Sequence, residues 1–142
     1  MGATAESAAE KSKAGRFGLK PGQVVQEFGY DEDVDGELRA AIEDVTGSEI
    51  VDEDGQDVVD AVLLWWRDGD GDLVDALVDA LTNLADGGVI WLLTPKSGRD
   101  GHVEPSDIED AAPTAGLHAT STISACAEWT GTRLASPRSG RR

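Results

Sequence analysis

Two short apolar runs constrain the fold of this chain more than any other feature. Residues 61–66 read AVLLWW and residues 89–93 read VIWLL, so apolar side chains stand at consecutive rather than alternate positions. A strand with this pattern is covered on both faces, which is typical of a parallel sheet between two layers of helices. Both runs are far shorter than the roughly 20 residues of a membrane-spanning helix. We therefore expect two central strands.

A helix is expected between these strands, because leucines recur there at helical spacing. The apolar face consists of Leu73, Leu77, Leu81 and Leu84, widened by Val74 and Val78. Acidic residues fall on the opposite face, as they do on a helix that lies against a sheet. Gly87 and Gly88 are expected to end this helix.

A strand, a helix and a brief strand are expected before the first apolar run. Residues 23–28 follow a Pro-Gly turn and are predicted to form the strand. The next helix has one apolar face, made by Val34, Leu38, Ile42 and Val45. Gly47 is placed to close it, since glycine adopts the left-handed conformation without a side-chain clash. Residues 49–51 are expected to form the brief strand.

The last third of the chain predicts one more helix and a pair of strands. Ser106 and Glu109 have the spacing of a capping box, so this helix is expected to begin with Ser106 as its cap. Pro113 is expected to end or kink it. Residues 119–136 are interpreted as two strands joined by a turn near Thr130 and Gly131.

These elements predict an α/β fold, an open three-layer Rossmann-like sandwich with a mostly parallel sheet and an antiparallel C-terminal strand pair. A single domain is expected over residues 17–136, between a disordered N-terminal tail of residues 1–16 and a basic disordered tail of residues 137–142. Trp65 and Trp66 should point to opposite faces of their strand. We expect both to be core residues rather than a platform for an aromatic ligand.

The formal net charge of −16 is concentrated in one half of the chain. Residues 31–79 contain 18 acids against two bases, Arg39 and Arg67. The negative electrostatic field of these acids repels phosphate backbones and anionic headgroups. We therefore expect no nucleic-acid partner and no membrane partner. The acids either form solvated faces or attract a protein partner with a basic surface. The sequence leaves the oligomeric state open.

Cys126 is the only cysteine, which excludes an internal disulfide and favours a reducing, cytoplasmic location. Residues 1–16 also lack the apolar segment of a signal peptide. A catalytic pairing of Cys126 with His102 or His118 is weighed against an inert thiol, and the alternating pattern around the cysteine favours the buried, inert thiol. One cysteine and two histidines do not form a zinc-ligand pattern.

The stretch DGDGD, residues 68–72, raises the question of a calcium loop. Asp68, Asp70 and Asp72 match positions 1, 3 and 5 of such a loop, but its sixth position needs glycine and holds Leu73. The helix that begins at Leu73 also uses the second half of the supposed loop. We therefore expect a turn in which Asp72 caps the helix, rather than a metal site.

The loop TPKSGRDGH follows the second central strand at its carboxyl end, where open α/β sheets commonly bind ligands. Its candidate anion-binding residues are Lys96, Ser97, Gly98, Arg99 and His102. Cationic side chains beside backbone amides can hold phosphate or carboxylate. The alternative is an exposed loop with balanced charges. The loop lacks the glycine and lysine pattern of a phosphate loop, so nucleotide hydrolysis is not predicted.

Five stretches resemble a family of small actinobacterial proteins catalogued as a domain of unknown function. They are GLKPGQVVQEFGYDEDVD, VLLWWRDGDGDLVDAL, LADGGVIWLLTPKSGRDGHVEPSDI, AAPTAGL and EWTGTRL, and the likeness spans about residues 17–137. This resemblance implies no activity.

A more distant likeness is to the class I methyltransferase sandwich, and it rests on AVLLWW, the helix after it, GGVIWLL, the helix ending in AGL and the closing strand pair. That family holds S-adenosylmethionine on a glycine-rich turn after its first strand. Here the turn is EFGYDED, in which only Gly29 remains and acidic side chains oppose the carboxylate of the cofactor. We therefore expect no cofactor.

The function expected from these observations is that of a non-enzymatic regulatory or interaction module. Its ligand is expected to be a protein partner or a small anion. A divergent methyltransferase-like or nucleotide-binding enzyme is the alternative, because a fold is shared between proteins more readily than its chemistry.

Overall fold

The computed structural model describes residues 17–136. The tails of residues 1–16 and 137–142, for which the sequence predicts disorder, lie outside the described residues. The elements in chain order are β1 (Val25–Phe28), α2 (Gly36–Thr46), β2 (Val59–Trp65), α3 (Leu73–Leu81), β3 (Leu84–Pro95), α4 (Pro105–Thr114), β4 (His118–Ser124) and β5 (Trp129–Ala135).

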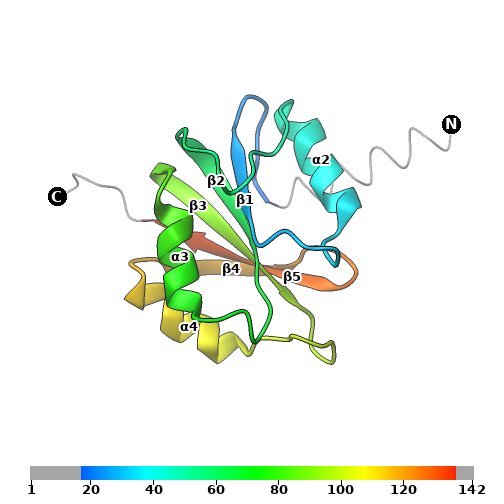
Figure 1. Cartoon of the computed structure of the whole chain (residues 1–142), viewed down its shortest axis with the longest axis vertical. Helices are drawn as coiled ribbons and strands as arrows, with labels where there is room; N and C mark the ends of the chain where they lie inside the picture. The colour runs from blue at the N-terminus through cyan, green and yellow to red at the C-terminus, as the bar shows by residue number, and fades with distance from the viewer. Residues whose placement is uncertain (1–16, 137–142) are drawn as a thin grey trace, which may run out of the picture.

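The strands form one five-stranded sheet in the order β1-β2-β3-β5-β4 (Figure 1). Strands β1, β2 and β3 are parallel, and β5 runs antiparallel between β3 and β4. The expected open α/β sheet, mostly parallel with an antiparallel pair at the C-terminal edge, is confirmed. The carboxyl ends of β1, β2 and β3 meet at one edge, and the loops after them are the natural place for a site.

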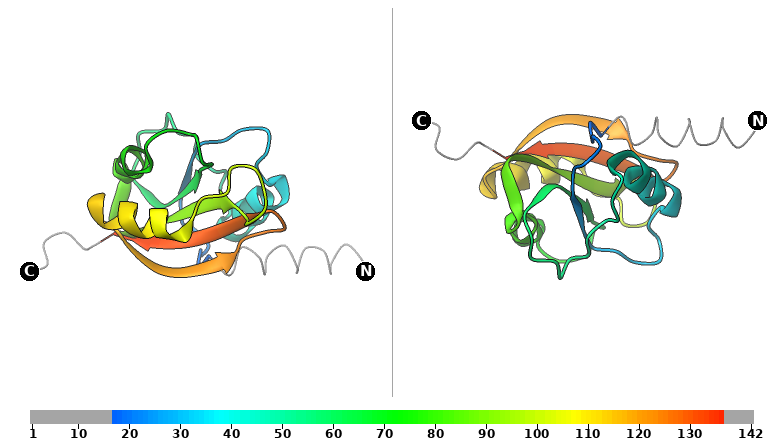
Figure 2. Two further views of the ribbon diagram at one scale, coloured as in Figure 1. Left: turned by 90° about the horizontal axis from the view of Figure 1, so that it is seen from below. Right: turned by 90° about the horizontal axis from the view of Figure 1, so that it is seen from above.

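Helices cover both faces of the sheet, as the consecutive apolar positions of β2 and β3 require. Helix α2 buries Leu38 and Ile42 against one face, while α3 and α4 bury Leu77 and Ile108 against the other. Figure 2 shows α3 and α4 apart from α2, with the sheet between them. The three-layer sandwich is therefore confirmed.

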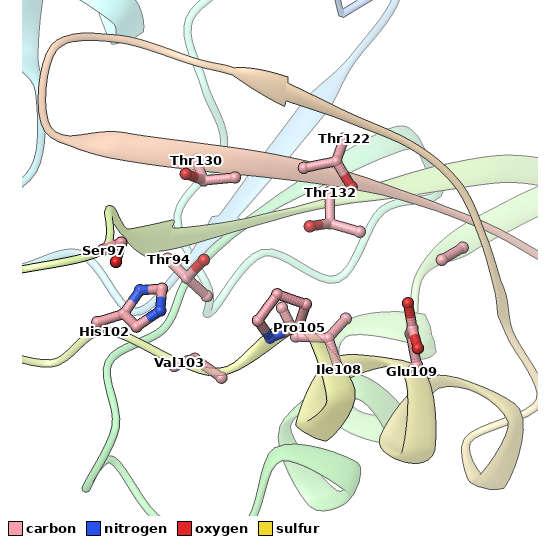
Figure 3. Close-up of a pocket in the computed structure, with 11 residues that line it drawn as sticks. Thr94, Ser97, His102, Val103, Pro105, Ile108, Glu109, Thr122, Thr130 and Thr132 are labelled. Carbon is pink, nitrogen blue, oxygen red and sulfur yellow. The ribbon is translucent and has the colours of Figure 1, made fainter.

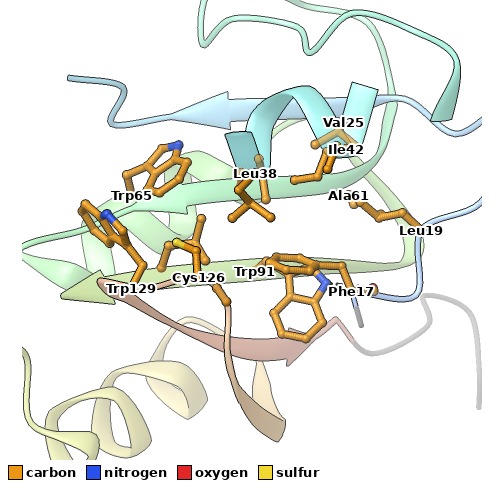
Figure 4. Packing of buried hydrophobic residues seen from close by; sticks show 14 residues of the cluster. Phe17, Leu19, Val25, Leu38, Ile42, Ala61, Trp65, Trp91, Cys126 and Trp129 are labelled. Carbon is orange, nitrogen blue, oxygen red and sulfur yellow. Dashed lines mark hydrogen bonds between the residues drawn. The ribbon is translucent and has the colours of Figure 1, made fainter. Parts of the chain in front are cut away.

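The tryptophans lie in the core as expected. Trp65 packs on the α2 face and Trp66 on the α3 face, and both are buried. Trp91 shares the face of Trp65, where its ring lies 4.5 Å from that of Phe17, between centroids, and its indole donates to the Phe17 carbonyl. Figure 4 shows this cluster, with Trp129 beside Trp65 and Cys126 between the layers. These aromatic side chains hold the layers together.

Two helix ends match the sequence prediction. Gly47 follows α2 with φ of 80°, the left-handed conformation expected of a closing glycine. Asp72 caps α3, and its carboxylate accepts from the backbone N–H of Asp75 at 3.3 Å. The cap of α2 is Asp35, which accepts from Leu38 N at 2.8 Å and was not predicted.

The predicted cap of α4 is wrong. Glu104 is the cap, Pro105 opens the helix and Ser106 lies inside the first turn. Proline suits the first helical position, because the N–H that it lacks has no partner there and its φ is already helical. Pro113 lies inside α4, which ends one residue later at Thr114, so the helix does end near this proline.

The predicted end of α3 is also wrong, because α3 stops at Leu81 and Leu84 begins β3. Asn83 explains the early stop. Its carbonyl accepts from Val59 N at 2.8 Å, and its side-chain amide donates to the Gly55 carbonyl at 2.7 Å. These bonds hold Asn83 beside β2, so the chain continues as a strand from Leu84 onward. Gly87 and Gly88 therefore lie within β3 instead of ending a helix.

Two further predictions need correction. The turn expected at Thr130 and Gly131 lies at residues 125–128, and Gly131 faces Leu93 inside the sheet. A Cβ on Gly131 would lie 3.4 Å from the side chains of Leu93 and Trp91, so this glycine makes room for packing rather than for a turn. The brief strand at 49–51 is reduced to a single bridge, which pairs Val51 with Gln26.

Candidate functional site

Arg67 ties together the loops at the carboxyl edge of the sheet. Its Nη1 donates to the carbonyls of Gly29 at 2.8 Å and Trp65 at 3.2 Å. Its guanidinium also pairs with Asp33 and Asp70 and lies 5.3 Å from the ring centroid of Trp129. The hydrogen bond from Arg67 holds the pKa of Asp33 below its ordinary value. The loops after β1 and β2 are therefore fixed to each other and to β5.

Gly29 lies against the end of β2. Its φ is 78°, and a Cβ at this position would come within 2.2 Å of the Trp65 carbonyl oxygen. Only glycine fits such an approach. The one glycine that remains in the turn after β1 thus has a packing role, which needs no bound cofactor to explain it.

A buried carboxylate fills the turn after β1 from the other side. Glu27 is 5% exposed and accepts from Arg39 Nε at 2.7 Å, Arg39 Nη2 at 3.0 Å and the indole of Trp65 at 2.8 Å. The Arg39 guanidinium lies 5.0 Å from the ring centroid of Tyr30. Sequence reasoning missed this network. Its one visible signal is a charged residue, Glu27, next to Phe28 at the end of a short strand.

Three hollows meet at Glu53, beside the carboxyl ends of β1 and β2. Their volumes are about 590, 230 and 300 Å³, and all three are lined by Glu53. We call them together the acidic groove. Its other exposed carboxylates are Asp52, Asp54, Asp70 and Asp79. Arg39 is the only base in its lining within residues 17–136, and it is bonded to Glu27.

The floor of the acidic groove is apolar. Phe28, Leu64, Trp66 and Ala76 line its middle part. Gly29 N donates to the Glu53 carboxylate at 3.4 Å, so the groove passes directly over the turn after β1. Carboxylates around an apolar floor suit long side chains that end in a positive charge, because the stem can be buried while the charge is paired.

The aspartates of DGDGD take part in turn geometry. Asp70 accepts from Arg67 N at 3.0 Å, Asp72 caps α3, and Asp68 N donates to the Gly101 carbonyl at 2.8 Å. Within residues 17–136, no three or more His, Cys, Asp or Glu side chains are placed to hold a metal ion. The geometry matches the expected turn.

The proposed anion loop lies at the carboxyl end of β3, and each long side chain in it has a contact. Lys96 Nζ donates to Ser124 Oγ at 2.6 Å, and Arg99 pairs with Glu128 at 3.1 Å. His102 Nδ1 lies 2.9 Å from the Pro95 carbonyl. Gly98 has φ of 88° at the tip of the loop. Ser97 and His102 face a neighbouring cavity, whereas Lys96 and Arg99 do not line it. Anion binding by this loop stays a prediction.

Cys126 is buried, as expected, but it lies in the turn between β4 and β5 and not in a strand. Burial, together with the nearby Asp35 carboxylate, raises the pKa of the thiol to about 11. Because the thiolate is the nucleophile, a thiol that stays protonated at neutral pH is a poor one.

Comparison with known proteins identifies the family. A model described as a protein of unknown function, DUF3052, matches residues 14–138. The chain belongs to the DUF3052 family. An uncharacterized protein of Mycobacterium tuberculosis H37Rv is 54% identical to this DUF3052 chain over 126 residues, which are 89% of this chain and 79% of the relative. An uncharacterized protein of Mycobacterium bovis matches equally well.

Solved structures similar to this DUF3052 protein include methyltransferases. Magnesium protoporphyrin IX methyltransferase from Synechocystis, with bound SAM, has a TM-score of 0.55 and 11% identity over 92% of this chain and 77% of its own. A SAM-dependent methyltransferase from Aquifex aeolicus has a TM-score of 0.56 and 14% identity over 89% of this chain and 88% of its own. At such identities the likeness shows a shared fold and no shared chemistry.

None of the helices within residues 17–136 has both the length and the apolar character that crossing a bilayer requires.

Proposed function

We propose that this DUF3052 protein is a non-enzymatic interaction module that binds a basic segment of a protein partner in the acidic groove. The observation that carries the proposal is the composition of the groove. Five exposed carboxylates surround an apolar floor, and the single base among them is already paired. A lysine- or arginine-rich segment matches this surface in charge and in the length of its side chains.

The turn after β1 supports a binding role over methyl transfer. Glu27, Arg39 and Trp65 bond to one another beside this turn, and Gly29 is pressed against β2. The turn keeps only Gly29, and its acidic side chains oppose the carboxylate of S-adenosylmethionine. The buried Cys126 thiol offers no nucleophile either.

The direct test is the affinity for a fluorescent oligo-arginine peptide, measured by anisotropy at low and at moderate salt. We expect Glu53→Gln with Asp79→Asn to weaken binding at least about tenfold, because both carboxylates lie at the centre of the groove and each lost charge pair contributes on the order of 1 kcal/mol.

A matched control distinguishes binding in the acidic groove from attraction to the net negative charge of the protein. Glu104→Gln with Asp107→Asn removes the same two charges from exposed positions on and beside α4, and we expect it to change the affinity less than about twofold. If the two double variants weaken binding equally, the peptide responds to net charge alone and the groove is not its site.

The small anionic ligand is the second candidate. It is favoured by the placement of Lys96, Ser97 and His102 together in one loop at the carboxyl end of β3. The two cationic side chains of the loop, Lys96 and Arg99, contact the exposed residues Ser124 and Glu128. A phosphate or carboxylate can therefore replace either contact at little cost in free energy.

A further inference from the structure

A second, separate cavity lies on the opposite part of the sheet, between α4 and the strands β3, β5 and β4. Its volume is about 190 Å³. Thr94, Thr122, Thr130 and Thr132 line one side, and Figure 3 shows them facing Pro105, Ile108 and Glu109 of α4 across the space. None of these residues lines the acidic groove.

The threonines form a continuous polar patch because of the strand register. Thr94 is directly opposite Thr130 across β3 and β5, and Thr132 is directly opposite Thr122 across β5 and β4. The neighbouring position on β3 is Leu92, which faces Thr132 and packs in the core under α3 and α4. A face that is apolar elsewhere therefore turns polar where the cavity begins.

Two of these threonines are buried residues whose hydroxyls have no hydrogen-bond partner within residues 17–136. Thr94 is 2% exposed and Thr132 is 5% exposed. Within residues 17–136, neither hydroxyl makes a hydrogen bond to another residue, whereas the equally buried hydroxyl of Thr46 donates to the Ile42 carbonyl at 3.0 Å. No described side-chain polar atom is sealed from solvent without a partner, so both hydroxyls reach the space of the cavity. Water in the cavity can therefore bond to these hydroxyls, and a ligand with hydrogen-bonding groups would take the place of that water.

The remaining polar groups of the cavity are the Ser97 hydroxyl, the His102 ring and the Glu109 carboxylate. Pro95 O can only accept, so Nδ1 of the His102 ring donates to it, and Nε2 lies 3.7 Å from the Glu104 carboxylate. The Glu109 carboxylate faces the threonines from α4. Because Glu109 is the only formally charged carboxylate in this lining and no lysine or arginine joins it, the cavity disfavours an anion.

We propose that this cavity binds a small uncharged molecule of about single-ring size that carries hydrogen-bond donors. Its apolar body would lie on Val103, Pro105 and Ile108, and its donors would reach the hydroxyls of Thr94 and Thr132. The size is suitable, since cavities of roughly 150 Å³ hold benzene. The proposal goes beyond the interaction role, since it concerns a cavity with a different lining and a ligand of different chemistry.

The test uses resorcinol, a ring with two hydroxyl donors, added to the full chain and followed by amide chemical shifts. We expect the shifts to concentrate on residues of β3, β5 and α4 around the cavity. Toluene, which lacks donors, and benzoate, which is an anion, should bind at least about tenfold more weakly. Equal binding of all three probes, or shifts spread elsewhere, would overturn the proposal.

Isosteric variants make the test independent of folding. Thr94→Val with Thr132→Val should weaken resorcinol binding at least about tenfold and leave oligo-arginine binding unchanged. In the free protein this double variant should keep or raise the melting temperature, because no hydrogen bond is lost. Thr46→Val is the matched control, and it should lower the melting temperature by a few degrees. A fall of the same size in the cavity variant would show that its hydroxyls are already bonded, which contradicts the proposal.

Discussion

The Nη1 atom of Arg67 donates to the backbone carbonyl of Gly29 at 2.8 Å, although 38 residues separate the two in sequence. The same side chain holds Asp33 and lies over Trp129. One arginine therefore fixes the turn after β1 against β2 and β5. The loop after β1 is thus held by contacts of the Arg67 side chain, which follows the neighbouring strand β2.

Replacing Arg67 should destabilise the fold. Arg67→Met keeps most of the stem and removes the donors, so we expect the free energy of unfolding to fall by about 2 kcal/mol, since the Gly29 carbonyl loses a charged partner. Urea denaturation measures this. Arg99→Met is the control, because its pair with Glu128 is exposed and contributes about 0–1 kcal/mol. Equal effects of the two variants would show that Arg67 does not hold the loops.

Gly29→Ala should also destabilise the protein, by about 2–3 kcal/mol. The new Cβ would lie 2.2 Å from the Trp65 carbonyl, and alanine is strained at a φ of 78°. Gly98→Ala is the matched control, because Gly98 has φ of 88° but open space around its Cβ. Gly98→Ala adds backbone strain alone, whereas Gly29→Ala adds the steric contact with Trp65 as well. The difference between the melting temperatures of the two variants therefore measures the effect of the contact. If both lose the same stability, the contact with Trp65 is not responsible.

Asp33 predicts an acid dependence of stability. The hydrogen bond from Arg67 lowers its folded pKa below the ordinary value of an aspartate. The unfolded chain therefore binds the proton more readily, and the contribution of Asp33 is present above about pH 4 and lost as the pH falls through the folded pKa. Asp33→Asn should therefore reduce the dependence of the unfolding free energy on pH, measured by urea denaturation between about pH 2 and 5. An unchanged pH profile would mean that the pair does not form.

Phosphate tests the loop after β3. If Lys96 and Arg99 bind an anion, added phosphate should raise the melting temperature of the wild type, and Lys96→Ala with Arg99→Ala should abolish that rise. Sulfate should act in the same way, whereas chloride at equal ionic strength should not. A rise that survives in the double variant would place the anion elsewhere.

Much of the fold follows from local patterns in the sequence. The consecutive apolar positions of β2 and β3 predict a sheet covered on both faces, and Gly47 and Asp72 mark helix ends through their own backbone and side-chain chemistry. These signals are local, so they can be recognised without knowledge of the tertiary contacts.

Several of the errors have tertiary causes. Leu84 continues the helical stripe of α3, yet Asn83 is bonded to Gly55 and Val59, which lie far away in sequence. Gly131 resembles a turn glycine, but it makes room for Trp91 and Leu93. The acidic groove and the threonine cavity are missed for the same reason, since each joins residues from several elements that have no common motif.

The central claim is that a methyltransferase-like fold serves here as a binding module. Isothermal titration calorimetry of the wild type with two ligands, oligo-arginine and S-adenosylmethionine, tests it most directly. We predict saturable heat with oligo-arginine that weakens as salt is raised, and none with S-adenosylmethionine, because the turn after β1 keeps a single glycine and carries acidic side chains that oppose the carboxylate of the cofactor. Saturable binding of S-adenosylmethionine, with no binding of the peptide, would contradict the account.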